Sequence, residues 1–257
     1  MNRIVSVVVV ALLVLLALGL GIPALVRWRT LAERTRCTDH MRVVAARISE
    51  YAQRDKAFPP GTVVVKDRPP EKRLSWVVLL LPGLGHAAEA KQIAMAEPWD
   101  AESNRAPGAT VIKSLLCPSL IDAWSTGGYG SLHYPGLAGA GADAARLDRS
   151  DRHAGIFGFD APTPVAAVKD GTSNVLLLLE TTRNLGPWIA GGPTSVRPFD
   201  PKEQPYLGEG RPFGGAHRGG VNAAFADGHC QFLSEKINPT VLEMLAAMAD
   251  GQVGPEP

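Results

Sequence analysis

The stretch Val221-Asn222-Ala223-Ala224-Phe225-Ala226-Asp227-Gly228-His229-Cys230-Gln231-Phe232-Leu233 decides the fold of the last third of the chain. An Asp-Gly pair between two apolar runs is a strong signal for a β-hairpin with a two-residue turn. With that turn, Phe225 faces Cys230 and Ala223 faces Phe232. We therefore predict an antiparallel hairpin whose apolar face is buried and whose other face can stay in water.

The amino-terminal segment is a candidate membrane helix. Ile4 to Val26 contains 23 residues without a charge, and at about 1.5 Å per residue such a helix spans a hydrocarbon layer roughly 30 Å thick. The alternative is a cleaved signal peptide, whose apolar region is about 7 to 15 residues long and ends at a small-x-small site. The segment shows neither feature, so we predict a retained anchor over residues 1–26 with the lipid bilayer as its partner.

An amphipathic helix follows the anchor. Its apolar positions recur every three or four residues, which is the period of one helix face; they are Cys37, Met41, Val44, Ile48 and Tyr51. We predict a stem helix over residues 27–56 whose apolar face packs on the protein's own sheet. The alternative is a helix that bundles with copies of itself.

The rest of the chain, residues 57–257, is predicted to be one globular domain. The whole sequence has a formal net charge of +1, with 27 glycines and 21 prolines that indicate long loops between short strands. No basic stripe interleaved with aromatic residues appears, so we expect no nucleic-acid partner. The apolar run 175–179 predicts a strand buried on both faces, and residues 241–249 predict a short helix after Asn238-Pro239.

Other segments are less specific. Residues 63–65 and 76–81 are apolar and fit either a strand or a buried helix, whereas residues 87–96 favour a helix. The irregular region between Gly127 and Gly158 offers four aromatic anchors, which are Tyr129, Tyr134, Phe157 and Phe159.

Seven short motifs follow one another along the chain, and the last of them is an H-x9-DG pattern near the carboxyl end. Nine residues separate His217 from Asp227-Gly228. The preceding motifs, in order, are the helix from Cys37 ending in Phe58-Pro59-Pro60-Gly61, the segment Leu74 to Pro82, Cys117-Pro118-Ser119, residues 154–159, Asp170-Gly171-Thr172-Ser173-Asn174 with Glu180, and Gly186-Pro187-Trp188.

In their order these motifs resemble the DUF1559 family, a large group of planctomycete proteins of unknown function. The resemblance implies a pilin-like or pseudopilin-like protein. Several family members begin like type IV prepilins, with a G-F-T-L-x-E processing site, whereas this chain reads Met1-Asn2-Arg3-Ile4-Val5-Ser6 and lacks that motif. Positive charge after the anchor, at Arg27, Arg29, Arg34 and Arg36, favours a cytoplasmic domain by count. Because long domains are translocated despite such charge, we follow the resemblance and expect the domain outside the cytoplasm.

The three cysteines, Cys37, Cys117 and Cys230, lack metal-binding spacing, so no zinc site is expected. In an oxidising compartment Cys37 and Cys117 are the candidate disulfide, tying the stem helix to a loop, and Cys230 is a candidate core residue. The alternative is three buried thiols.

Catalysis is not expected. A triad of Ser173, His217 and Asp227 is disfavoured because Ser173 lacks a G-x-S-x-G elbow and the strand separates His217 from Asp227. His217 is interpreted as a loop fastener and Asp227 as a turn residue. A weaker alternative is a calcium site built from oxygens of Asp170, Asn174, Glu180 and Asp227. No other cofactor is expected.

These observations predict an α+β protein with a long helix packed on an antiparallel sheet. The predicted role is structural, a membrane-anchored envelope or surface component that self-associates, or binds envelope proteins, through its helix. Two alternatives remain open. One is a ligand-binding or ion-binding sensory domain, and the other is a hydrolase with its site at the His217 loop.

Overall fold

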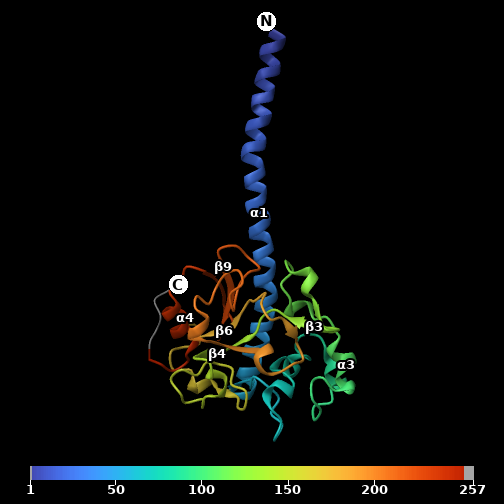
Figure 1. Cartoon of the computed structure of the whole chain (residues 1–257), viewed down its shortest axis with the longest axis vertical. Helices are drawn as coiled ribbons and strands as arrows, with labels where there is room; N and C mark the ends of the chain where they lie inside the picture. Colours follow the sequence, from blue (N-terminus) through green and yellow to red (C-terminus); the bar gives the residue numbers. More distant parts are fainter. Residues whose placement is uncertain (1, 252–257) are drawn as a thin grey trace.

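A computed structural model describes residues 2–251 of the chain. Met1 and residues 252–257, which the predicted anchor and domain include at their ends, lie outside the described residues. Helix α1 (Asn2–Asp55) is the longest element and projects from the rest of the molecule (Figure 1). It runs without interruption through the predicted boundary between anchor and stem.

The two ends of α1 have opposite surroundings. Its outer part contains a window long and apolar enough to cross a membrane, and 0% of that window is buried. Its inner part presents Cys37, Met41, Val44 and Ile48, each 0% exposed, to the protein core. The period of three and four residues therefore identified the packed face correctly, and α1 contacts β1, β6, β9 and β10 of the same chain.

A five-stranded sheet forms the centre of the domain, in the order β10-β9-β6-β4-β8. Its strands are β4 (Gly136–Ala140), β6 (Leu176–Leu179), β8 (Val196–Phe199), β9 (Gly220–Phe225) and β10 (Cys230–Ser234). All neighbours are antiparallel except β4 and β8, which are parallel. The fold is α+β, with a helix packed on a largely antiparallel sheet, as predicted.

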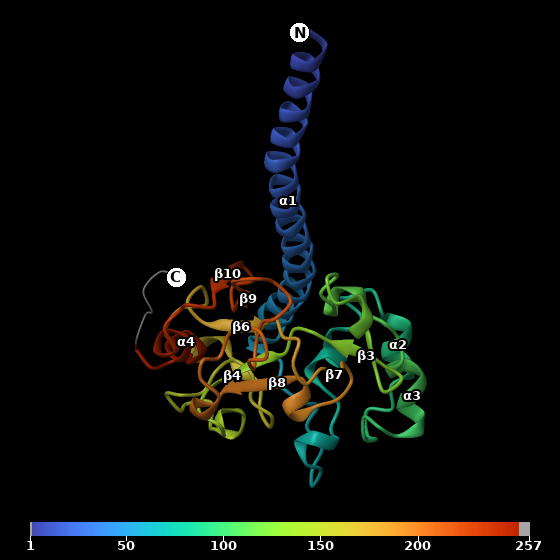
Figure 2. The same ribbon diagram turned by 45° about the horizontal axis from the view of Figure 1, so that its top comes forward.

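Smaller elements surround this sheet. β2 (Ser125–Thr126), β3 (Tyr129–Leu132) and β7 (Gly186–Pro187) form a second sheet, and β1 (Ala57–Phe58) pairs with β5 (Thr163–Pro164). The short helices are α2 (Ala87–Gln92), α3 (Glu102–Gly108) and α4 (Pro239–Ala246). Figure 2 shows the second sheet with α2 and α3 on one side of the inner end of α1 and the central sheet with α4 on the other.

The central sheet is covered on both faces. One core joins α1 to Leu177, Leu178 and Ala224, and a second joins α4 to Val221, Ala223 and Phe225. All six residues of β9 are buried, and so are all four of β6. The prediction that β6 is buried on both faces is therefore confirmed. The prediction that the other face of the hairpin can stay in water is wrong for β9, whose residues are all buried, whereas β10 is mostly half-buried.

The register of the hairpin differs from the prediction by one residue. Ala224 pairs with Cys230 and Ala223 with Gln231. The turn has three residues rather than two, since the Phe225 N–H bonds to the His229 carbonyl at 2.9 Å and Gly228 adopts φ +94°. A positive-φ glycine at this point is the bulge that follows a type I turn in three-residue hairpins. The slip moves Cys230 and Phe232 to the face opposite Ala223 and Phe225.

The local predictions for other segments have mixed outcomes in the folded domain. The apolar run after Ser75 forms a 3-10 helix, η2 (Trp76–Leu80), capped by the Ser75 hydroxyl, which accepts from Val77 N–H at 3.2 Å. Residues 63–65 form neither helix nor strand. Helices α2 and α4 are shorter than predicted and end at Gln92 and Ala246. The four aromatic anchors between residues 127 and 159 are all buried.

Candidate functional site

A disulfide joins the stem helix to the globular domain. Cys37 of α1 is bonded to Cys117, which follows the 3-10 helix η3 (Lys113–Leu115), with 4.8 Å between their Cα atoms. These are the two cysteines that the sequence analysis paired. Both are fully buried, and the bond closes a sequence separation of 80 residues. A cross-link over so long a loop strongly restricts the unfolded chain.

Two neighbouring residues hold the backbone around this bond. The Tyr134 hydroxyl donates to the Cys37 carbonyl at 3.3 Å, and His133 Nδ1 accepts from the Cys117 N–H at 3.0 Å. His133 Nε2 lies 3.0 Å from the Ala123 carbonyl, so the single ring proton is on Nε2, donating to that oxygen. Burial lowers the pKa of His133, and burial followed by the nearby Glu180 charge raises the pKa of Tyr134. Both side chains are therefore held neutral.

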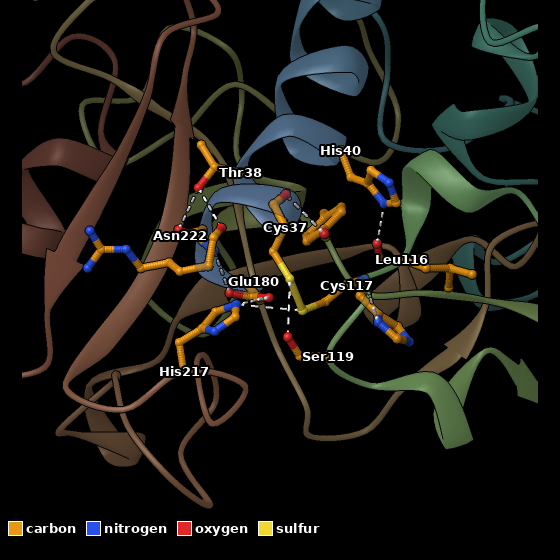
Figure 3. The surroundings of a disulfide bond; sticks show 12 residues. Cys37, Thr38, His40, Leu116, Cys117, Ser119, Glu180, His217 and Asn222 are labelled. Carbon is orange, nitrogen blue, oxygen red and sulfur yellow. Dashed lines mark hydrogen bonds and ion pairs between the residues drawn. A yellow bond between two sulfur atoms is a disulfide. The ribbon is translucent and has the colours of Figure 1, made fainter. Parts of the chain in front are cut away.

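A buried histidine and carboxylate lie against the disulfide (Figure 3). His217 Nε2 is 3.6 Å from Cys117 Sγ and 3.4 Å from Glu180 Oε1. The His217 and Glu180 side chains are only 3% and 0% exposed. His217 comes from the loop before β9 and Glu180 follows β6 directly, so adjacent strands of the sheet bring the two together.

A hydrogen-bonded chain positions the carboxylate. Asn222 Nδ2 donates to Glu180 Oε2 at 3.1 Å, and the Thr38 hydroxyl donates to Asn222 Oδ1 at 3.0 Å. This chain runs from α1 through β9 to the end of β6. Glu180 Oε1 has no hydrogen-bond partner. It lies 3.4 Å from His217 Nε2. A buried carboxylate oxygen without a hydrogen bond is costly, so this oxygen is the least satisfied atom of the site.

The arrangement also groups potential metal ligands. Among the described residues, Cys37, Cys117, Glu180 and His217 bring their ligand atoms within 4.8 Å of one another. The three cysteines lack the close spacing of a zinc motif, so the sequence predicts no zinc site. In the oxidised form the two sulfur atoms are bonded to each other, and the site is a covalent cross-link between α1 and the rest of the domain.

Comparison with known proteins identifies the family. Residues 28–199, more than half of the chain, match the family described as "Protein of unknown function (DUF1559)". The chain belongs to the DUF1559 family. No curated protein and no solved structure matches it. The matched residues include both cysteines and Glu180, while the hairpin of the H-x9-DG motif lies beyond them.

The DUF1559 landmarks divide into two groups in space. His217 lies at the disulfide, before β9, whereas Asp227 and Gly228 lie beyond the other end of that strand. The carboxylate of Asp227 bonds to its own turn, accepting from His229 N–H at 3.0 Å and lying 2.7 Å from His229 Nδ1. His217 and Asp227 therefore have separate partners.

The polar turn Asp170 to Asn174 supports the hairpin tip and residues 250–251. The Thr172 carbonyl accepts from Asp227 N–H at 3.0 Å. The Asp170 carboxylate accepts from the N–H groups of Asp250 and Gly251, each at 3.0 Å, and Asn174 Nδ2 donates to the Asp170 carbonyl at 2.8 Å. The oxygens proposed for calcium thus serve two distant places, with Glu180 at the disulfide and the others near the hairpin tip.

Sequence reasoning missed three residues of the site, His133, Asn222 and Thr38. His133 is 16 positions from Cys117, and Thr38 is 184 positions from Asn222. No local pattern links such positions. The one available signal was an uncompensated polar residue, Asn222, in an otherwise apolar strand, since a buried amide requires partners.

Proposed function

We propose that this DUF1559 protein is a single-pass membrane protein of the cell envelope with a structural, non-catalytic role. One observation carries the proposal. A single unbroken helix carries an apolar window in its outer part, of which 0% is buried, and its inner part contributes Cys37, Met41, Val44 and Ile48 to the core of the domain. The same helix therefore connects the apolar segment to the core of the domain, which suits a protein that presents a domain at a fixed position above a bilayer.

The disulfide supports placing the domain outside the cytoplasm. Disulfides persist in oxidising compartments and are rare in the cytosol, and Cys37 and Cys117 form one in the core of the domain. The arginines after the anchor favour the opposite orientation by count, yet long domains are translocated despite such charges. We give the disulfide more weight than the charge count in placing the domain outside the cytoplasm. Both cysteines are buried, and reduction would remove a stabilising cross-link.

The absence of a catalytic role is part of the proposal. The groups considered for a hydrolytic triad have separate partners, with His217 beside Glu180 and Asp227 bonded to His229. A hydrolase of the triad type requires its nucleophile, base and orienting carboxylate within hydrogen-bond reach of one another. A turnover lost on His217→Ala with the fold intact would favour the enzymatic alternative instead.

The anchor is tested against a cleaved signal sequence by membrane extraction. Cells expressing the full chain are fractionated, the membranes are washed with alkaline carbonate, and the mass of the protein is measured. We expect an intact chain that stays in the membrane pellet. A soluble product that has lost the residues before about Trp28 would contradict the proposal.

Lateral association through the outer helix is tested by cross-linking. Single cysteines are placed along α1, one at a time from Val5 to Leu20, in a Cys230→Ser background, and membranes are treated with a mild oxidant. Association through one face predicts dimers at positions that recur every three to four residues. Uniformly weak cross-linking along the helix would show that the anchor acts alone.

A specific cavity favours ligand binding as the second candidate function. A hollow of about 380 Å³ lies beside the hairpin tip, and Thr172 and Asp227 from two family motifs line it together with Lys56 and Phe58. Its size is within the range of small-molecule sites. A saturable rise in unfolding temperature with small carboxylates or amino acids, weakened by Lys56→Gln, would support this function.

A further inference from the structure

The four side chains at the stem disulfide have the chemistry of a metal site. Two cysteines, one imidazole and one carboxylate are all ligand types that Zn²⁺ accepts in four-coordinate sites. They come from α1, the loop after η3, the end of β6 and the loop before β9, and all four are buried. Figure 3 shows His217 and Glu180 converging on the sulfur atoms from the sheet side.

We propose that reduction of the Cys37–Cys117 disulfide converts this cluster into a zinc site, with the two thiolates, His217 Nε2 and Glu180 Oε1 as ligands. The reductant is a dithiol, which supplies two electrons and two protons to the S–S bond and is itself oxidised to a disulfide. Binding of the metal then releases the two thiol protons to solvent. The inference goes beyond the proposed structural role, because it assigns a second, metal-bound state to the same pair of cysteines.

The spacing of the nitrogen and oxygen atoms supports this assignment. With metal-ligand bonds of about 2.0 to 2.3 Å, a tetrahedral zinc site holds its ligand atoms about 3.3 to 3.8 Å apart. His217 Nε2 is already 3.4 Å from Glu180 Oε1 and 3.6 Å from Cys117 Sγ. All four ligand atoms lie within 4.8 Å of one another, and the two sulfur atoms, which are bonded to each other in the oxidised form, have to separate.

The state of Glu180 is a second, independent observation. Its side chain is 0% exposed, and Oε1 points into the cluster without a hydrogen bond. Oε2 is held by Asn222, which Thr38 holds in turn. In metal sites, residues outside the ligand set hold a ligand in position through hydrogen bonds. Asn222 and Thr38 hold the Glu180 carboxylate in this way, and its Oε1 faces the cluster.

The protein around the cysteines is arranged to keep them in place after reduction. Tyr134 bonds to the Cys37 carbonyl and His133 to the Cys117 N–H. Neither bond involves a sulfur atom, so both survive opening of the disulfide. The inner part of α1 also remains packed through Met41, Val44 and Ile48.

Cobalt binding to the full chain tests the proposal. Purified protein in detergent is reduced with dithiothreitol, the reductant is removed without oxygen, and Co²⁺ is added as the spectroscopic probe for zinc. We expect one Co²⁺ per chain, with thiolate-to-cobalt charge-transfer bands and the visible bands of tetrahedral cobalt, displaced by Zn²⁺. The oxidised protein should show none of these bands. Their absence from the reduced protein would overturn the proposal.

Variants identify the ligands. Glu180→Gln and His217→Ala should each weaken binding at least tenfold, while Cys230→Ser, which removes the free cysteine, leaves it unchanged. Unchanged affinity in both ligand variants would overturn the assignment. Where a variant does not fold, thermal unfolding of the reduced wild-type chain decides the question. A higher unfolding temperature with Zn²⁺ supports the site, and no shift overturns it.

Discussion

At the scale of single residues, His133 controls the environment of Cys117. Its Nδ1 accepts from the Cys117 N–H and its Nε2 donates to the Ala123 carbonyl. Protonation would place a hydrogen on Nδ1 and break the bond to Cys117. Burial lowers the pKa of His133, which is the shift that a histidine locked in a neutral, hydrogen-bonded state requires.

This shift predicts a loss of stability in acid. Below about pH 6.5, the ordinary histidine pKa, the unfolded chain binds more protons at His133 than the folded chain does. The free energy of unfolding therefore decreases as the pH is lowered. The contribution is complete above about pH 6.5 and is lost as the pH falls through the lower folded-state pKa. His133→Gln should flatten this part of the profile, measured by urea unfolding between pH 8 and pH 5. Equal slopes for wild type and variant would contradict the assignment.

The hairpin turn depends on one glycine. Gly228 has φ +94°, and a Cβ added there would lie 3.2 Å from Ser49 Oγ of α1. We predict that Gly228→Ala lowers the free energy of unfolding by about 1–3 kcal/mol, the cost of a strained backbone conformation. Gly228→Asn should lose less, because asparagine tolerates positive φ. Urea unfolding measures both, and an alanine variant as stable as wild type would contradict the bulged turn.

At the scale of elements, the inner half of α1 is a core element and not a detachable stem. Ile48 is 0% exposed, whereas Val43, five positions away, is 44% exposed. The same helix therefore offers a matched pair of positions for measuring how much the domain depends on it. Helices in proteins derive most of their stability from such packing rather than from intrinsic propensity.

We predict that Ile48→Ala lowers the free energy of unfolding by about 2–5 kcal/mol, because it leaves a cavity in the core. Val43→Ala on the exposed face should change it by less than about 0.5 kcal/mol. Denaturant unfolding of the full chain in detergent gives both values. Similar effects at the two positions would mean that α1 is not docked as described.

The elements differ in how far sequence alone predicts them. The period of Cys37, Met41, Val44 and Ile48 identifies the packed face of α1, because helix geometry is local. The hairpin was predicted but its register was not, since Asp-Gly occurs in turns of both two and three residues and one extra residue reverses a strand's faces. The cluster of Glu180, His217 and Cys117 depends on strand order in the sheet, which no local pattern contains.

At the scale of the whole molecule, the chain is a domain built around the inner end of a helix whose outer end is exposed and apolar. Figure 1 shows the consequence, a domain at one end of α1 and the amino terminus at the other. The Cys37–Cys117 bond fastens the inner part of α1 covalently to the rest of the domain. The central claim is that a membrane lies around the outer helix and that the domain is outside the cytoplasm.

Protease protection in spheroplasts tests this claim most directly. The full-length protein carries a tag after Pro257, and a cytoplasmic protein serves as the control for intact cells. We predict that added protease digests the tag and the domain while the cytoplasmic control survives. Protection of both the tag and the control would place the domain in the cytoplasm and contradict the account.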